Sequence, residues 1–418
     1  MKRVTSVVFI ILCLFTALSS AAQGVVPPKY EYRAVWLTTI ENLDWPRKPA
    51  VDAAGAELQK AQLVEILDSL KALHINTVLL QTRVRGDVIY PSAIEPFARL
   101  LTGTSGKAPL YDPLAFAIEE CHKRGLKVIM DIVPNHSSTS HWWYNDQPFA
   151  DWTHQWDKYT QSNWTFSTNM DFNASTADLY QMESGWFDRS MADMNLDNPY
   201  LLHYFKQWAV WWIEFSGLDG LRVDTYPYNE KMPMSEWCKA VIEEYPNFNI
   251  VGEVWTSSIP QLAYWQGGNY NKDGFNSNLK SIMDFPLHDA MRSAMSESGN
   301  AGWGQGMTRV YDVVSHDFVY HDLSNMMIMA ANHDTDRIAD VCEGDVRKMK
   351  IVHTLLLTMR GMPQMLYGDE LMFRSTDRSK GHPTLRVDFP GGWSGELFHR
   401  LRYRRLGGCH HLYRHPEG

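Results

Sequence analysis

Residues 111–136 read YDPLAFAIEECHKRGLKVIMDIVPNH and contain one complete unit of the fold. Asp112 followed by Pro113 indicates a helix start, since an Asp side chain caps the first turn and proline fits the first helical position. Gly125 ends this helix, and the apolar run 126–133 that follows predicts a buried strand. A helix followed directly by a buried strand is the repeating unit of a parallel α/β sheet.

The same alternation of β-rich and helical runs continues on both sides of this unit. We expect further helices at 56–73, 198–215 and 345–360, and a long insertion without clear helical period at 136–195. Eight strands alternating with helices predict an α/β fold, a (β/α)8 TIM barrel. The alternative is an open doubly wound sheet, which is less favoured because no GxGxxG turn follows the first strand. The expected strands are 33–39, 75–82, 126–133, 220–224, 249–253, 281–285, 326–331 and 363–367.

Apolar spacing indicates which face of each helix packs inward. In the run 56–73 the inward residues are Leu63, Ile66, Leu67 and Leu70. In the run 198–215 they are Leu201, Phe205, Trp208, Trp212 and Phe215.

The first 22 residues have the pattern of a signal peptide. Lys2 and Arg3 form a basic start, the apolar run 7–17 is too short for a membrane span, and residues 20–22 (Ser-Ala-Ala) offer a cleavage site. Since no other apolar stretch has spanning length, we expect no stable membrane insertion after cleavage. The expected location is secreted or periplasmic.

Charge and cysteine content exclude several partners. Removing Lys2 and Arg3 takes the formal charge from -9 to -11, which disfavours nucleic acid. The four remaining cysteines are scattered and form no CxxC pair, so they predict neither a disulfide framework nor a zinc site. They are Cys121, Cys238, Cys342 and Cys409.

Polar side chains gather at the ends of four expected strands. Active sites of such barrels form at the carboxyl ends of the strands, so these side chains are candidates for catalysis. One such acid alone would be read as a structural ion pair, but four strand ends together favour a functional site. The strand ends read DIVPNH (131–136), GLRVD (220–224), GEVW (252–255) and NHD (332–334).

Asp224 and Glu253 end neighbouring strands, about 4.7–4.9 Å apart in a sheet. Glycoside hydrolysis needs one carboxyl to protonate the leaving oxygen and a second to attack carbon or to activate water. Neighbouring strands make a carboxyl separation of about 5–5.5 Å attainable, which is the retaining geometry. Arg222 shares a barrel face with Asp224 and can hold it ionised.

These four motifs, in this order, resemble glycoside hydrolase family 13, the α-amylase family, from about residue 127 to 393. MADMN (191–195) and YGDE (367–370) are similar to the neopullulanase and cyclomaltodextrinase group of that family. The resemblance implies that Asp224 is the nucleophile, Glu253 the acid/base and Asp334 the stabiliser of the transition state. The implied substrates are starch-type glucans: starch, pullulan, maltooligosaccharides and cyclomaltodextrins.

The resemblance also implies a set of binding residues. His136 and His333 would bind the sugar at the cleavage point, and Arg222 would orient Asp224. Calcium is the implied cofactor, at Asn135, for which a turn-stabilising role is the alternative. Trp255 and Trp142 are further candidates for substrate binding, and packing inside the insertion is the alternative for Trp142 or its neighbour Trp143.

Residues 33–125 resemble a different glycosyl-hydrolase-like barrel family, related in outline to family 10. That resemblance rests on RAVWLTTIENLDWP (33–46), RGDVIYPSAIEPFARLLTGTSGKAP (85–109) and YDPLAFAIEECHKRGL (111–126). The chain thus reads as two half-barrels joined between residues 122 and 131. The family 13 tyrosine under the reacting sugar falls in the replaced part, where Tyr90 is the candidate substitute.

The expected divisions are a signal peptide (1–22), barrel strands one to three (23–135), the insertion (136–195), the rest of the barrel (196–393) and an irregular tail (394–418). The tail is rich in Arg and His, and we expect a truncated C-terminal part. Three functions remain open: an active retaining α-glucan hydrolase, a catalytically impaired or glucan-binding chimera, and a hydrolase of another glycan that follows the N-terminal family.

Overall fold

The computed structural model describes residues 33–39, 42, 44–84, 87–93, 95–297, 303–375 and 384–386. The expected signal peptide and the tail 394–418 lie outside the described residues, as does Cys409. Cys121, Cys238 and Cys342 are buried free thiols. Within the described ranges, no helix combines the length and the apolar character that a bilayer crossing requires.

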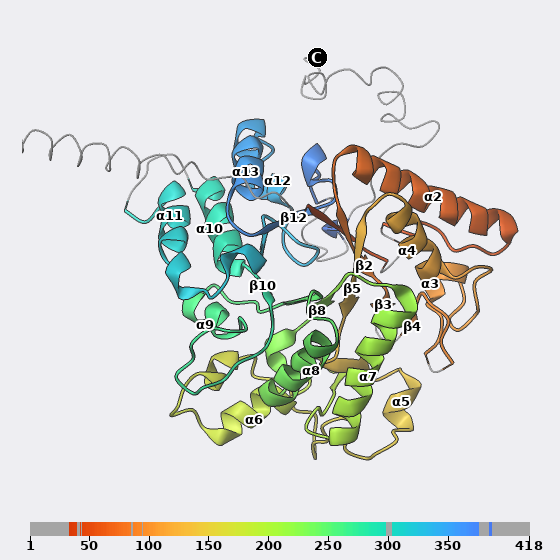
Figure 1. Ribbon diagram of the computed structural model, residues 1–418, viewed down its shortest axis with the longest axis horizontal. Helices are drawn as coiled ribbons and strands as arrows, with labels where there is room; N and C mark the ends of the chain where they lie inside the picture. Colours follow the sequence, from red (N-terminus) through yellow and green to blue (C-terminus); the bar gives the residue numbers. More distant parts are fainter. Residues whose placement is uncertain are drawn as a thin grey trace, which may run out of the picture. The chain divides into compact units, whose positions relative to one another are not determined.

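Eight parallel strands close into a barrel (Figure 1), so the (β/α)8 prediction is confirmed and the open sheet is wrong. The strands follow one another around the barrel in the order β1-β12-β11-β10-β9-β8-β5-β2. Most are shorter than expected at one or both ends, because the backbone leaves the sheet and enters a loop there. The bounds are β1 (Ala34–Leu37), β2 (Thr77–Gln81), β5 (Lys127–Ile132), β8 (Gly220–Val223), β9 (Asn249–Gly252), β10 (Ser281–Met283), β11 (Met326–Met329) and β12 (Met362–Leu366).

Helices cover the outside of the barrel, and acidic or amide side chains cap the starts of several. Asp52 accepts a hydrogen bond from Gly55 N (2.8 Å) and begins α2 three residues before the expected start. Asp112 and Asn198 cap α4 and α7 as predicted. The main helices are α2 (Ala53–Ala72), α4 (Pro113–Lys123), α7 (Pro199–Ser216), α8 (Lys231–Glu244), α9 (Ile259–Tyr264), α10 (Phe285–Ser296), α11 (Met307–Ser315) and α13 (Val346–Thr358).

The predicted inward faces hold with one exception. Leu63 and Leu67 of α2 are fully buried, and Trp212 of α7 is 1% exposed. Phe215, however, is 55% exposed and stacks on Trp211, so its inward placement was wrong. Phe215 stands at the edge of the apolar stripe in the last turn of α7, where Trp211 is its packing partner.

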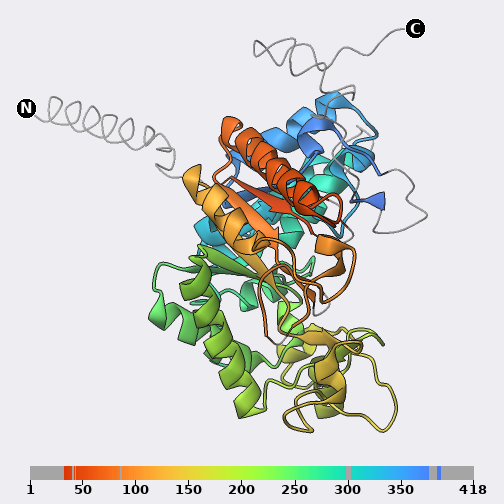
Figure 2. The ribbon, with the colours of Figure 1, turned by 90° about the vertical axis from the view of Figure 1, so that its right-hand side faces the viewer.

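The insertion projects from one end of the barrel, shown in yellow in Figure 2. Its base is a two-stranded antiparallel sheet of β6 (His136–Ser138) and β7 (Met191–Asp193), in which His136 pairs with Asp193. The segment contains more helix than its composition suggested, namely α5 (Trp142–Asn145) and α6 (Thr176–Ser184). The side chain of Ser175 caps α6. A smaller hairpin, β3 (Arg83–Val84) with β4 (Asp87–Val88), follows β2.

The first two strands join the other six through main-chain pairing on both sides. β2 pairs with β5 over five residues, and β1 pairs with β12 over three. Inside the barrel, side chains from both parts of the chain form one apolar cluster. Its members are Ala34, Trp36, Leu79, Ile129, Val251, Met283, Phe285, Met327 and Met329.

Candidate active site

Asp224 and Glu253 lie side by side at the carboxyl ends of β8 and β9. The register pairs Val223 with Gly252, so the residue after each strand stands at the same level. Glu253 N donates to Val223 O (2.9 Å) and continues the ladder. A side chain at Gly252 would meet Leu279 at 2.6 Å, so close packing against glycine fixes the backbone just before Glu253.

The guanidinium of Arg222 lies between the two acids. Its Nη1 donates to Asp224 Oδ1 and to Asp131 Oδ1 (3.0 Å), and its Nη2 lies 2.5 Å from Glu253 Oε1. Arg222 is fully buried. Asp131 faces Arg222 across the β5–β8 pair. The sequence motif DIVPNH begins with Asp131 but does not by itself mark it as a site residue, and the register with Arg222 is what brings it into the site.

Burial controls the protonation of this cluster. It raises the pKa of Glu253 to about 8, with Asp224 and Asp334 adding to the effect and Arg222 opposing it. Burial also raises the pKa of Asp131 to about 6, although the positive charge of Arg222 acts to lower it. Glu253 is therefore protonated near neutral pH, as a general acid must be, and Thr225 N donates to its other oxygen (3.1 Å).

Asp334 follows β11, and both of its oxygens are held. Its Oδ2 lies 3.0 Å from His333 Nε2, and its Oδ1 accepts from Arg386 Nη2 (2.5 Å). Arg386 Nε also donates to His333 O (2.9 Å). Burial raises the pKa of Asp334, but His333, Arg386 and Arg222 together outweigh it and hold the pKa far below its ordinary value. Sequence reasoning missed Arg386, since no motif links it to NHD.

His136 lies on the insertion side of the same site. Its Nδ1 is 3.0 Å from Asn135 Oδ1, and its ring stacks on Phe187. Burial lowers its pKa to about 4, and Asp224 opposes that shift. A neutral imidazole in this position can accept or donate a hydrogen bond to a sugar hydroxyl without adding charge.

The predicted aromatic residues divide into exposed and buried side chains. Trp255, two residues after Glu253, is 43% exposed and stacks on Phe285. Trp142 is 46% exposed on the insertion, whereas its neighbour Trp143 is buried and packs against Trp152. Both Trp255 and Trp142 thus have surface available for a ligand. Packing is the role of Trp143.

Tyr90 does not take the place of a tyrosine under the sugar. It is 2% exposed, packs edge-on against Trp212 and donates its hydroxyl to Glu95 Oε2 (3.0 Å). Glu95 also binds Arg83 Nε (2.6 Å). The suggestion that Tyr90 stacks on the substrate is therefore wrong, because the buried Arg83–Glu95 pair uses its hydroxyl and Trp212 covers its ring.

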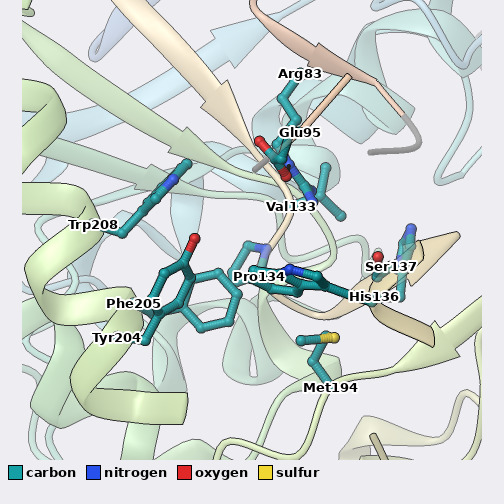
Figure 3. Close-up of a pocket in the computed structure, with 11 residues that line it drawn as sticks. Arg83, Glu95, Val133, Pro134, His136, Ser137, Met194, Tyr204, Phe205 and Trp208 are labelled. Carbon is teal, nitrogen blue, oxygen red and sulfur yellow. Dashed lines mark hydrogen bonds and ion pairs between the residues drawn. The ribbon is translucent and has the colours of Figure 1, made fainter. Parts of the chain in front are cut away.

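A cavity adjoins this ion pair and the insertion (Figure 3). Arg83 and Glu95 lie at one side and His136 at the other. None of Asp224, Glu253 and Asp334 lines it. The remaining lining residues are Val133, Pro134, Ser137, Trp143, Met194, Tyr204, Phe205 and Trp208.

A second acidic cluster lies beside Asn135 at the base of the insertion. Asn135 Nδ2 donates to Asp193 Oδ1 (3.2 Å), and His154 Nδ1 lies 2.7 Å from Asp193 Oδ2. His154 Nε2 lies 3.4 Å from Glu230 Oε1. His154, Asp193 and Glu230 are all buried, and their ligand atoms lie within 4.8 Å of one another. Sequence reasoning named only Asn135 here.

The charges of this second cluster fit a bound cation. Burial raises the pKa of Asp193 well above its ordinary value, and Glu230 adds to the effect; burial likewise raises that of Glu230. A divalent ion would favour the ionised forms of both carboxyls. Carboxylate and amide oxygens suit calcium, whereas a histidine nitrogen among carboxylates is also typical of zinc.

The candidate catalytic cluster, formed by Asp131, Asp224, Glu253 and Asp334 around Arg222, combines three chemical features at one point. It holds a carboxyl that is protonated near neutral pH, a neighbouring carboxylate on a permanent cation, and a third carboxylate fixed by a histidine and an arginine. Two carboxyls that flank a sugar bond, with a third group for the sugar hydroxyls, suffice for glycoside hydrolysis.

Comparison with known proteins agrees with the fold and identifies the family. The family model "Alpha amylase, catalytic domain" matches residues 112–383, more than half of the chain, so this protein belongs to the alpha-amylase family. The model "Glycosyl hydrolase-like 10" matches residues 31–174. Both resemblances inferred from the motifs are thus confirmed, and the two matches overlap across the expected junction at 122–131.

The individual relatives include both a glycosyl hydrolase and a cyclomaltodextrinase. Residues of this chain are 43% identical over 97 positions to glycosyl hydrolase YngK of Bacillus subtilis (strain 168), covering 23% of this chain and 18% of the relative. They are 28% identical over 261 positions to a cyclomaltodextrinase of Geobacillus thermopakistaniensis (strain MAS1), covering 62% and 41%. The chain therefore spans less than half the length of these curated relatives.

Solved structures support the fold. The α-amylase of Geobacillus thermoleovorans, determined in complex with acarbose, superposes with a TM-score of 0.64 at 22% sequence identity. The match covers 89% of this chain and 77% of that chain. At this identity the likeness establishes the barrel architecture.

Proposed function

We propose that this protein is a retaining glycoside hydrolase that cleaves α-glucosidic bonds in starch-type glucans. The observation that carries the proposal is Arg222, whose two terminal nitrogens meet Asp224 and Glu253 separately. One guanidinium thereby sets the two acids side by side, and burial keeps one of them protonated. The family and a cyclomaltodextrinase relative support the substrate class.

The first chemical step breaks the glycosidic bond. Asp224 attacks the anomeric carbon while Glu253 gives its proton to the leaving oxygen, so a covalent glycosyl–Asp224 ester and a free sugar hydroxyl form. Arg222 keeps Asp224 aimed. Asp334, held by His333 and Arg386, accepts hydrogen bonds from hydroxyls of the reacting sugar, and His136 lies on the other side of the site.

The second step reverses the roles. Ionised Glu253 takes a proton from water, the resulting hydroxide attacks the anomeric carbon, and Asp224 leaves as a carboxylate. Glu253 is protonated again at the end, so the cycle needs no outside acid. Two inversions at the same carbon retain the anomeric configuration.

Asp224→Asn tests the proposal directly. Wild type should release reducing sugar from soluble starch, pullulan or cyclomaltodextrin with retention of configuration, and the variant should lose at least about 10³-fold in kcat. Asp219→Asn is the matched control, because Asp219 lies at the opposite end of the same strand and binds Val128 N. A folded wild type as inert as Asp224→Asn would favour a glucan-binding or impaired chimera instead.

We also propose a divalent cation at the cluster of His154, Asp193 and Glu230, with calcium as the ion that the family resemblance implies. The ion would neutralise two buried carboxyls and join three parts of the chain: the insertion loop, β7 and the start of α8. Its role there is structural, since the three catalytic acids belong to the other cluster.

We further propose that the chain is exported and cleaved after Ala22. The supporting pattern is the basic start, the short apolar run and the small residues 20–22. Mass spectrometry of protein expressed with this leader in a bacterial host should show Gln23 as the first residue, in the periplasm or medium. An intact Met1 in the cytoplasm would contradict export.

A further inference from the structure

Trp36 of β1 lies under the catalytic cluster, although it comes from the part of the chain that resembles the other hydrolase family. It is fully buried inside the barrel. Its ring stacks on His333, with ring centroids 4.3 Å apart and planes 27° from parallel. The guanidinium carbon of Arg222 lies 5.0 Å from the centroid of the same ring.

The contact with Arg222 completes the surroundings of that guanidinium. Its terminal nitrogens are taken by Asp131, Asp224 and Glu253, which hold its edge. Its Nε has no hydrogen-bond partner among the described residues, and the Trp36 ring lies against the guanidinium carbon. Edge contacts alone allow the plane to tilt, whereas a ring against it restricts the tilt.

Tilt of Arg222 matters because one nitrogen serves two acids. Nη1 donates to both Asp131 and Asp224, so a small rotation of the guanidinium that shortens one hydrogen bond lengthens the other. The same ring supports His333, whose Nε2 is 3.0 Å from Asp334. One side chain thus contacts the residues that orient two of the three acids.

The structure assigns Trp36 as a positioning residue that fixes Arg222 and His333, and through them Asp224 and Asp334. The kinetic consequence rests on the proposed function, but the geometric assignment does not. Trp36 Nε1 has no hydrogen-bond partner among the described residues, so the ring face, rather than the indole N–H, makes these contacts.

The competing explanation is that Trp36 only fills the barrel. Its neighbours inside the barrel include several methionines. In such an apolar interior, a substitution that nearly conserves volume costs little stability. A filling role predicts lower stability with unchanged chemistry. A positioning role predicts that kcat falls at temperatures where the variant is fully folded.

Trp36→Leu and Trp36→Phe separate these roles, with Trp45→Leu as control. Trp45 belongs to the same part of the chain, is equally buried and donates Nε1 to Gln59 O (2.8 Å), away from the acids. On a starch-type oligosaccharide, Trp36→Leu should lower kcat about tenfold or more with KM within about threefold. Trp36→Phe should recover most of the rate, and Trp45→Leu should keep it.

A second readout does not depend on catalysis. At the distance of 5.0 Å, the ring current of Trp36 should shift the Nε–H resonance of Arg222 in the NMR spectrum of the full chain, so Trp36→Leu should move that resonance and Trp45→Leu should not. An unmoved resonance, or equal kcat in Trp36→Leu and Trp45→Leu, overturns the assignment. If wild type cleaves none of the glucans, the proposed function is wrong. The Arg222 resonance then tests the positioning role of Trp36 by itself.

Discussion

Two clusters of carboxyls, most of them buried, lie near the insertion end of the barrel, and they differ in the basic residue at their centre. In the catalytic cluster, Asp131, Asp224 and Glu253 surround Arg222. In the insertion cluster, Asp193 and Glu230 flank His154. Both sets are assembled from segments distant in sequence.

The central base determines what each cluster can do. Arginine stays charged at any ordinary pH, so the catalytic cluster carries its own permanent cation. Burial lowers the pKa of His154 to about 4, so this histidine is neutral near pH 7 and offers no positive charge to the two carboxyls. The catalytic cluster therefore contains its own cation, whereas the insertion cluster lacks one and can accept a metal ion.

The largest expected effect is the removal of the central cation from the catalytic cluster. Arg222→Met leaves three acids around an apolar group and should destabilise the fold by about 3–5 kcal/mol, with loss of measurable hydrolysis. Urea unfolding and a reducing-sugar assay measure the two effects. Arg124→Met removes an arginine that binds Asp68 and Glu120 near the surface and should change stability by about 1 kcal/mol or less. Equal losses in the two variants would contradict the central role of Arg222.

The next effect is the response of the insertion cluster to metal. At a free ion concentration 100 times Kd, stability should rise by about 2.7 kcal/mol, seen as a higher Tm after chelator-treated protein receives calcium or zinc. Asp193→Asn should abolish the rise, whereas Asp188→Asn on the same insertion should keep it. Metal analysis of untreated protein identifies the ion. A Tm insensitive to both ions and to chelator would show that the cluster is metal-free.

A third effect concerns pH and Glu253. Burial raises the pKa of Glu253 from its ordinary value of 4.5 to about 8, so its ionisation destabilises the fold progressively as pH rises from about 4.5 through 8. Glu253→Gln avoids this loss. The variant should match wild type near pH 4, and its advantage in unfolding free energy should grow steadily from about pH 4.5 to pH 8.5, in urea unfolding curves at each pH. A stability difference that does not change with pH would contradict the raised pKa.

The smallest effect is expected at Arg386. Its loss removes one of the cations that lower the pKa of Asp334, while His333 and Arg222 remain. Arg386→Gln should move the acid limb of kcat/KM upward by less than about one pH unit. Arg374→Gln, which removes the partner of Asp340, serves as the control. An unshifted acid limb would show that Arg386 does not act on Asp334.

The barrel and the main acids were predictable from sequence because both depend on local patterns. Buried strand runs alternate with capped helices, and topology then brings the ends of β8 and β9 together. Asp224 and Glu253 follow from that geometry alone. Phe215 was misplaced because helical spacing indicates a face without saying how far the neighbouring helices extend along it.

The remaining features depend on contacts between distant residues. Trp36 and His333 come from opposite ends of the described chain, and no spacing rule connects them. Arg386 reaches Asp334 from a segment beyond β12. His154 meets Glu230 only because the insertion folds back onto the start of α8. Such pairs appear once the chain is closed into three dimensions.

The pairing of β1 with β12 and of β2 with β5 uses peptide N–H and C=O groups alone, which every amino acid except proline supplies in full. The main-chain pairing between the two parts therefore does not depend on which family each part comes from. Selection after a recombination event would act mainly on the few inward side chains at the junction, such as Trp36. A pair of strands and their helix can in this way behave as a heritable module, exchangeable between enzymes that share a barrel and little else.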